Sequence, residues 1–321
     1  MIIPVSAIPL VSIVTPSFNQ GAFIAQTIDS VLAQDYANLE YLIMDGGSTD
    51  ETLDVLRSYG SRIRWISASD GGQSAAINRG WQISQGEFLA WVNSDDLLKP
   101  GAIREAVSAF HQQPETAMVY GECDYIDQTG RIIGQYATRP FDYYDLLKSV
   151  ANYLPQPSVF IRRAALESAG WLDESLHYLM DYDLYLRIGN RGSVAFIARP
   201  LAALRLHDDA KSLDRLAAFG EEMVRIIERA LSSNSLPPEL RSCRPEIMCN
   251  AYIYAASCSY WSGEIAQAKK WLRHAWRETQ FPSFPRRLAR LTLLAALGTY
   301  GRERIERWHP NPYTTLLDNV S

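Results

Sequence analysis

Adjacent acidic residues that follow an apolar segment are the first candidates for chemistry in this sequence of 321 residues. Asp95 and Asp96 end the stretch Asn93-Ser94-Asp95-Asp96, which directly follows the apolar run 88–92. Two carboxylates at the end of a buried strand suit a divalent cation that itself carries a phosphate. Asp also starts turns and caps helices, so these residues alone leave both interpretations open.

The elements that must position these acids alternate between strands and helices. Strands are predicted at residues 11–16, 41–44, 63–66 and 88–92, and each of the first three is followed by a segment with helical periodicity. This alternation predicts an α/β fold with a mostly parallel sheet and helices on both faces, whose ligands bind beyond the carboxyl ends of the strands. The acids expected at that rim are Asp45, Asp70, Asp95 and Asp96. Crowded carboxylates call for a cation or for a ligand that donates hydrogen bonds.

The middle of the chain predicts a mixed extension of this sheet. Short strands are expected at 118–121, 125–126, 132–133, 156–161, 194–197 and 201–206, with helices at 163–169 and 180–188. Asp181 and Asp183 lie in the first turn of the second helix, where an acid is either a general base or a favourable partner of the helix dipole. His207 follows the last strand, near the other candidate ligands.

Composition excludes several classes of protein. The net charge of −5 argues against a general nucleic-acid binder, and the four cysteines show no CxxC pair, which indicates reduced thiols and a cytoplasmic location. The first residues lack the pattern of a signal peptide, and no stretch approaches 18 uninterrupted apolar residues. We therefore expect neither a secreted protein nor a membrane span.

Residues 214–321 are expected to form a helical extension of a catalytic domain at 1–213. A helix is predicted from Leu213, and residues 246–279 resemble a helical hairpin of the tetratricopeptide type, which needs a partner to bury its face. The segment 281–307 combines leucines with Arg286, Arg287, Arg290 and further arginines. Two interpretations stand: a basic amphipathic helix in an anionic membrane interface, or a capping helix whose arginines are solvated.

The ordered set of motifs over residues 9–213 resembles the family-2 glycosyltransferases, which have a GT-A, Rossmann-like fold. Each motif is weak alone, whereas the order is specific. The motifs are Val11-Ser12-Ile13-Val14-Thr15-Pro16-Ser17-Phe18-Asn19, Met44-Asp45-Gly46-Gly47-Ser48-Thr49-Asp50, Asp70-Gly71-Gly72-Gln73 through Asn78-Arg79-Gly80, Asn93-Ser94-Asp95-Asp96, Gln156-Pro157-Ser158, Met180-Asp181-Tyr182-Asp183-Leu184 and Arg205-Leu206-His207.

The resemblance implies a role for each matching position. Asp96 matches a ligand of Mn²⁺ or Mg²⁺, with His207 near the metal or the diphosphate, and Asp181 matches the general base with Asp183 as the fallback. Met180 departs from the family, which usually has an acid there. The residues implied to bind the nucleotide-sugar are Thr15, Pro16, Ser17, Asn19, Asp45, Asp70, Gly72, Gln73, Asn78 and Asp95.

The resemblance also implies the reaction. We expect inverting transfer of a sugar from a nucleotide-sugar, with UDP favoured by its frequency in the family, to a hydroxyl of a glycan or lipid-linked acceptor in polysaccharide or glycoconjugate assembly. The reduced cysteines indicate that the enzyme acts in the cytoplasm, and the membrane interpretation of residues 281–307 would place it at the inner face of the membrane. The alternatives are a metal-dependent nucleotidyltransferase, which the lack of a lysine-bearing glycine-rich loop disfavours, and a non-catalytic nucleotide-sugar-binding scaffold. The absence of GxGxxG after the first strand argues against a dehydrogenase.

Overall fold

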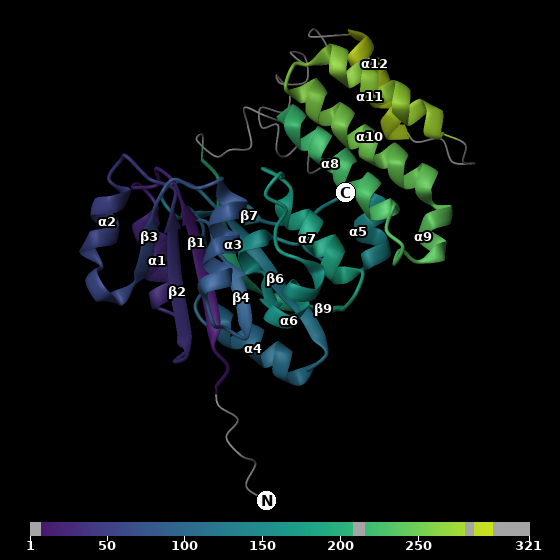
Figure 1. The fold of residues 1–321 in the computed structure, drawn as a ribbon. Coiled ribbons are helices and arrows are strands. Elements are labelled where there is room, and N and C mark those ends of the chain that lie inside the picture. The colour runs from purple at the N-terminus through teal and green to yellow at the C-terminus, as the bar shows by residue number, and fades with distance from the viewer. Residues whose placement is uncertain (1–7, 208–215, 280–285, 298–321) are drawn as a thin grey trace, which may run out of the picture. The chain divides into compact units, whose positions relative to one another are not determined.

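The computed structural model describes residues 8–207, 216–279 and 286–297. The chain divides into two compact units, one of residues 1–141 with 153–207 and one of residues 142–152 with 208–321 (Figure 1). The predicted boundary between residues 213 and 214 remains a prediction. The structure adds that a short segment from the middle of the chain, 142–152, groups with the C-terminal helices.

The first unit begins with strands and helices in alternation, as the apolar periodicity predicts. In chain order these elements are β1 (Val11–Ser17), α1 (Ile24–Leu32), β2 (Leu39–Asp45), α2 (Thr52–Ser58), β3 (Arg64–Ser67), α3 (Gln73–Ile83) and β4 (Phe88–Trp91). A 3₁₀ turn, Gly60–Arg62, precedes β3. The strands β3, β2, β1 and β4 are neighbours in that order and all pair in parallel (Figure 1).

The rest of this unit extends the sheet with strands of both directions. Its elements are β5 (Leu97–Leu98), α4 (Ala102–Gln112), β6 (Thr116–Ile126), β7 (Ile132–Gln135), a 3₁₀ turn (Gln156–Ser158), β8 (Phe160–Arg162), α6 (Arg163–Ala169), α7 (Met180–Gly189) and β9 (Ser193–Arg205). β8 pairs antiparallel with β4 and β6, and β6 pairs in parallel with β9. The described sheet has the order β3-β2-β1-β4-β8-β6-β9-β5. The predicted mixed, mostly parallel α/β sheet is confirmed.

The core lies on both faces of this sheet, because successive side chains of a strand point to opposite sides. Ile13 and Ile43 pack with α1 and α4 in one apolar cluster. On the opposite face, a Cβ added at Gly80 of α3 would lie 2.6 Å from Val14, so only glycine allows α3 to approach the sheet this closely. Helices therefore cover both faces and leave the carboxyl ends of the strands as the open edge of the sheet.

Four local predictions were wrong. Residues 116–126 form the single strand β6, where two strands at 118–121 and 125–126 were expected. Residues 156–161 do not form one strand, because Gln156–Ser158 turn as a 3₁₀ segment before β8. Residues 193–205 form the single strand β9 instead of two, with its register shifted near Pro200. The stretch Ser48-Thr49-Asp50-Glu51 predicts a capping box with Ser48 at the N-cap, but the Ser48 hydroxyl donates to Asp45 and α2 begins only at Thr52.

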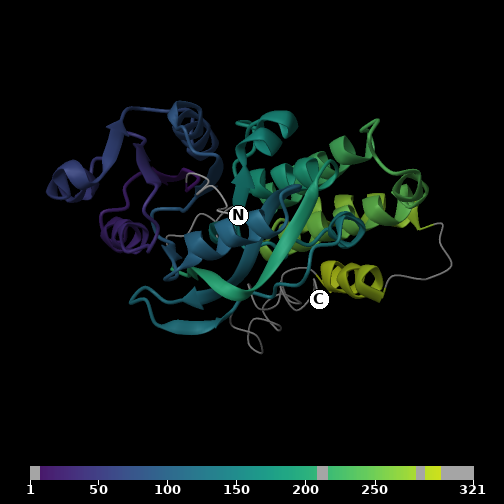
Figure 2. The same cartoon turned by 90° about the horizontal axis from the view of Figure 1, so that it is seen from below.

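The second unit is helical in its described part (Figures 1 and 2). It contains α5 (Tyr143–Ser149), α8 (Leu216–Leu231), α9 (Pro238–Ser242), α10 (Arg244–Trp261), α11 (Ile265–Glu278) and α12 (Arg286–Leu297). α10 and α11 are the expected hairpin, and α8, α5 and α12 all pack against α10. Leu213 and the arginines at 302, 304 and 307 lie outside the described residues.

Two expectations from composition can be compared with the structure. None of the helices that the structure describes is both long and apolar enough to cross a membrane. All four cysteines are free, and burial raises the pKa of the Cys123 and Cys258 thiols well above its ordinary value. Both groups therefore stay in the thiol form.

Candidate active site

The open edge of the sheet brings together side chains from the ends of four strands. The backbone N–H of Gly46, after β2, donates to the carbonyl of Ser17 at the end of β1 (2.8 Å). A Cβ added at Gly46 would lie 3.2 Å from the Asp70 carboxylate, so the segment after β3 lies against the same turn. The fold thus places Ser17, Asp45 and Asp70 at one rim, as expected from the parallel strands.

Asp45 is buried at this rim and holds the turn that follows it. Its carboxylate accepts hydrogen bonds from the backbone of Gly47 and Ser48 (3.1 and 3.0 Å) and from the hydroxyls of Ser48 and Ser67. Only 2% of Asp45 is exposed, so its carboxylate stabilises the turn at the rim instead of facing solvent. Asp70 is exposed, and its carboxylate accepts a hydrogen bond from the N–H of Gly72. Gly72 directly precedes α3 and has a φ of 106°, a conformation that favours glycine.

The loop after β1 is fastened to the start of α2. Asn19 has a φ of 52°, its N–H donates to Ser48 Oγ (2.8 Å), and its Oδ1 accepts from Thr49 N (2.9 Å). The N–H of Gly21 donates to Asp50 Oδ2 (2.9 Å). Asn19 remains exposed, as does the ring of Phe18 at 60%. These hydrogen bonds therefore fix the conformation of the loop after β1 at one side of the rim.

Asn93 connects the start of α3 with the end of β4. Its Oδ1 accepts from Gln73 Nε2 (2.8 Å), and its Nδ2 donates to both Asp96 Oδ2 and Gln156 Oε1 (3.1 Å each). Gln156 donates in turn to the carbonyl of Trp91 (2.8 Å). The 3₁₀ turn that carries Gln156 is therefore part of the site, a role that the motif Gln156-Pro157-Ser158 alone does not predict.

Asp95 and Asp96 point into different surroundings. The side chain of Asp95 is 23% exposed and its Oδ2 lies 3.0 Å from Nε2 of His207. Asp96 is only 3% exposed, and its two oxygens accept from the N–H of Arg205 (3.0 Å) and from Asn93 (3.1 Å). Burial, together with the neighbouring Asp95 charge, raises the pKa of Asp96 well above its ordinary value. The expected direct metal ligand, Asp96, thus has both oxygens engaged inside the protein.

Arg205 fixes this pair of acids from the end of β9, and the site predictions did not include it. Its N–H donates to Asp96, and its buried guanidinium donates to the carbonyls of Asp95, Asp127 and Gln128 and to Oε1 of Gln26. The sequence signal was its place directly before Leu206-His207 in the last motif. A side chain bonded so fully to protein serves to hold the loop that presents Asp95.

The donor set fits Mn²⁺ or Mg²⁺ when a phosphate supplies part of the coordination. Asp95 and His207 offer a carboxylate oxygen and an imidazole nitrogen at one point, and Mg²⁺-type sites commonly use one or two protein ligands with substrate phosphates and water. In the described ranges, no three His, Cys, Asp or Glu side chains gather as a metal cage. His207 Nδ1 is buried without a hydrogen-bond partner among these residues.

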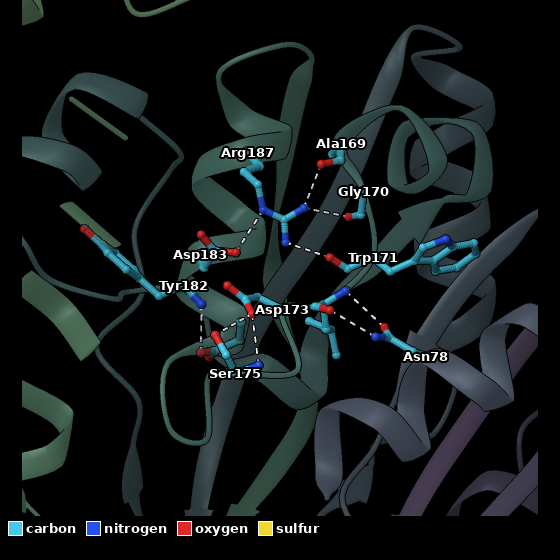
Figure 3. Close-up of polar contacts among 11 residues, drawn as sticks. Asn78, Ala169, Gly170, Trp171, Asp173, Ser175, Tyr182, Asp183 and Arg187 are labelled. Carbon is cyan, nitrogen blue, oxygen red and sulfur yellow. Dashed lines mark hydrogen bonds and ion pairs between the residues drawn. The ribbon is translucent and has the colours of Figure 1, made fainter. Parts of the chain in front are cut away.

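Asp181 and Asp183 on α7 also differ in their surroundings. Asp183 is 2% exposed and its carboxylate pairs with Arg187 Nε (2.9 Å), while the same guanidinium donates to the carbonyls of Ala169, Gly170 and Trp171 (Figure 3). Asp183 therefore braces the segment before α7. Asp181 is partly exposed in the first turn. Burial raises the pKa of the Tyr185 hydroxyl, and the Asp181 charge raises it further, so a protonated phenol lies near this acid.

Three predicted nucleotide-sugar residues are held inside the protein. Thr15 is fully buried within β1, with Oγ1 3.0 Å from the Tyr41 hydroxyl, and Pro16 is buried beside it. Asn78 is 4% exposed, and its amide exchanges two 3.0 Å hydrogen bonds with the backbone of Leu172 (Figure 3). The polar side-chain atoms of Thr15 and Asn78 are used in contacts within the protein, and the buried Pro16 has no polar side-chain atom. Asn78 instead holds the segment that leads to Asp181.

Comparison with known proteins identifies relatives of this domain. The model of Glycosyl transferase family 2 matches residues 12–169. An uncharacterized glycosyltransferase of Rickettsia typhi is 32% identical over 208 residues, which cover 62% of this chain and 65% of the relative. A chondroitin synthase of Escherichia coli is 30% identical over 228 residues, covering 70% of this chain and 33% of that protein. The chain thus spans less than two thirds of the length of these curated relatives.

Solved structures show the same fold. Residues 1–349 of Staphylococcus aureus TarS in complex with UDP-GlcNAc align with a TM-score of 0.64 at 17% identity, over 92% of this chain and 87% of that one. The mannosyltransferase PcManGT of Pyrobaculum calidifontis, in complex with GDP-Man and Mn²⁺, aligns with a TM-score of 0.59 at 19% identity, over 98% and 86%. The expected GT-A fold with a helical C-terminal region is confirmed.

Proposed function

This chain belongs to glycosyl transferase family 2, and from that premise we propose that it transfers a sugar from a nucleotide-sugar to an acceptor hydroxyl with inversion at the sugar carbon. The observation that carries the proposal is the rim itself. One edge of the sheet gathers the partly exposed Asp95 paired with His207, the exposed Asp70, and the Gln73–Asn93 contact. A separate, partly exposed acid, Asp181, lies in the first turn of α7.

The nucleotide is assigned to the rim between β1 and β3. The exposed Phe18 ring offers stacking area beside the turn held by Asp45, and the exposed side chains of Asn19 and Asp70 offer polar groups. The N-terminus of α3, which begins at Gln73, adds the positive end of a helix dipole, which suits an anionic group. UDP is the favoured nucleotide because a neighbour of the same fold is in complex with UDP-GlcNAc, while another is in complex with GDP-Man.

Asp95, rather than Asp96, is assigned as the protein ligand of the cation, together with His207. The Asp95 carboxylate is partly exposed, whereas the two oxygens of Asp96 accept hydrogen bonds from the Arg205 N–H and from Asn93 Nδ2. When bound, Mn²⁺ or Mg²⁺ would neutralise charge on the departing nucleoside diphosphate. Asp96 and Arg205 then have the task of orienting Asp95, which is the role of residues behind metal ligands.

Asp181 is assigned as the general base. It is partly exposed at the start of a helix, where the dipole favours its charged form, and the buried Asp183 is committed to Arg187. Met180, at the position where the family usually has an acid, is 6% exposed and belongs to the core. The base therefore acts without a neighbouring carboxylate at that position. The acceptor class is a growing glycan or a lipid-linked sugar, in line with the naming of the chondroitin synthase relative.

Replacement of Asp181 by Asn tests the assignment of the base. We expect Asp181→Asn to bind UDP in the presence of Mn²⁺ like the unmodified chain, while sugar transfer falls by a factor of about 10² or more, since a positioned base contributes about 10²–10⁴. Calorimetry measures binding, and release of UDP in the presence of acceptor measures transfer. The matched control is Asp145→Asn, which also changes an acid in the first turn of a helix.

The identity of the donor is tested first by thermal shift. UDP-, GDP- and dTDP-sugars are compared with and without Mn²⁺, and a ligand at about 100 times its Kd stabilises the folded chain by about 2.7 kcal/mol. We expect a UDP-sugar to raise the melting temperature most, and only with the cation. Stabilisation by no nucleotide-sugar would contradict the proposed function, and turnover of Asp181→Asn near that of the unmodified chain would remove the proposed base alone.

A further inference from the structure

The outer face of α11 and α12 concentrates positive charge in a chain that is acidic overall. All seven cations of these helices are exposed, and we call them the basic face: Lys269, Lys270, Arg273, Arg277, Arg286, Arg287 and Arg290. The same helices contain one acid, Glu278, while the whole chain has a net charge of −5. Such asymmetry indicates an anionic partner.

Helical periodicity explains why these cations point outward. Leu272 of α11 and Leu288 of α12 are buried in one apolar cluster with their neighbours at helical spacing, Ala268, Ala275, Leu291 and Ala295. The two helices are joined by a hydrogen bond from Trp276 Nε1 to Thr292 Oγ1 (3.1 Å). The apolar stripe of α12 is therefore occupied by the hairpin, as in the capping interpretation, and only the outer side is available to a partner.

Two apolar side chains lie exposed on the same helices as the cations. Trp276 is 38% exposed and Leu293 is 63% exposed. Trp276 follows Arg273 by one helical turn and precedes Arg277, and Leu293 follows Arg290 by one turn. A soluble polyanion would need only the cations. A bilayer surface takes both kinds of group, because headgroups attract the cations while tryptophan and leucine enter the boundary with the acyl chains.

We propose that the basic face docks this protein on a lipid surface rich in anionic headgroups. The contact is peripheral and mainly electrostatic, which differs from the amphipathic helix laid flat in the interface that residues 281–307 suggested. Residues 281–285 and 298–307 of that segment lie outside the described residues, and the proposal rests on α11 and α12 alone.

Vesicle co-sedimentation with the full chain tests the proposal. We expect binding to vesicles of phosphatidylcholine with 40% phosphatidylglycerol, none to pure phosphatidylcholine, and loss of binding as salt rises. Each cation near such a surface contributes about fivefold in partitioning, so Arg286→Gln with Arg290→Gln should weaken binding about 25-fold. Lys269→Gln with Arg273→Gln is an independent pair on α11 with the same expected loss. Leu293→Ala should weaken binding several-fold.

Arg64→Gln with Arg191→Gln is the matched control, because it removes two exposed arginines of the first unit. This control should bind like the unmodified chain, and circular dichroism melting checks that all variants fold. The proposal is overturned if the full chain ignores anionic vesicles, if both pairs bind like the control, or if heparin is bound in place of vesicles. Nucleotide-sugar binding, measured separately, does not depend on any of these outcomes.

Discussion

At the scale of single residues, two neighbouring acids with the same side chain perform different tasks. Asp95 is partly exposed and contacts His207, while Asp96 is buried and accepts from the backbone of Arg205. The sequence shows both as polar residues after an apolar strand. Which of them faces the ligand depends in part on β9, more than 100 residues later, because Arg205 of that strand donates to one oxygen of Asp96 while Asn93 donates to the other.

Substitution of each acid separates the two tasks. Asp95→Asn keeps an acceptor for His207 but removes a charge, so we expect the free energy of unfolding to change by no more than about 0.5 kcal/mol. The Mn²⁺-dependent gain in UDP affinity should fall tenfold or more. Asp96→Ala leaves two donors without an acceptor and should lower the free energy of unfolding by about 2 kcal/mol or more.

Urea unfolding and titration of UDP with and without Mn²⁺ measure both effects. If the UDP affinity of Asp95→Asn depends on Mn²⁺ as in the unmodified chain, Asp95 is not the ligand of the cation, and Asp96 becomes the candidate ligand. Thr15 and Asn78 were also expected to bind the nucleotide-sugar, yet both are buried. A polar side chain in a motif serves a ligand or the protein, and only the surrounding structure distinguishes the two.

At the scale of elements, the loop after β1 depends on one carboxylate at the start of α2. Asp50 accepts from Gly21 N (2.9 Å) with one oxygen and from Thr52 N (3.0 Å) with the other. Desolvation opposes the charge of Asp50, yet hydrogen bonds from Thr52 and Gly21 outweigh it and lower the pKa below the ordinary 3.8. The charged form therefore stabilises the folded loop.

The sign of this shift predicts a pH dependence. A carboxyl whose pKa is lower in the folded state contributes stability above its unfolded value, and loses it as pH falls through the folded value. Asp50→Asn should lower the free energy of unfolding by about 1 kcal/mol at pH 7, since one hydrogen bond to a charged group is lost. The difference from the unmodified chain should persist down to about pH 4 and shrink only below it. A difference that disappears between pH 7 and 5 in urea titrations would contradict this account.

Local pattern predicted most elements of the first unit. β1, α1, β2, α3 and β4 were found because apolar runs and helical periodicity follow each other cleanly there. The apolar neighbours of Gln156–Ser158 predict a strand, whereas these residues form a 3₁₀ turn in which Gln156 donates to the Trp91 carbonyl and Ser158 donates to the Gly121 carbonyl. These bonds connect residues 65 and 37 positions apart, which local periodicity does not detect.

At the scale of the whole molecule, the order of motifs was more informative than any motif alone. It identified the family and the GT-A fold, because several weak patterns in a fixed order match by chance far less often than one. It did not predict the composition of the two units. α5 packs on α10, with Asn250 donating to the carbonyl of Lys148 (2.7 Å), and so belongs with helices that begin about 100 residues later.

This arrangement predicts the behaviour of a shortened chain. Ending the chain at His207 removes α10, against which α5 packs, and we expect this to uncover Leu146 and Leu147, both fully buried in the complete chain. We expect the short chain to bind the dye ANS and to associate, because each leucine loses about 1.5–3 kcal/mol of burial. Leu146→Gln with Leu147→Gln in the short chain should reduce both effects. Size-exclusion chromatography and ANS fluorescence measure them, and a monodisperse short chain without dye binding would argue against the grouping.

The place of α5 in the chain has a consequence for biosynthesis. A ribosome adds roughly 5–20 residues per second, so about 5–20 s separate the synthesis of α5 from that of the middle of α10. During that interval α5, which carries Leu146 and Leu147, lacks the helix against which it packs. A chaperone that binds short apolar segments on nascent chains would bind α5 during this interval. Slower translation between residues 150 and 250 would lengthen the time available for that binding.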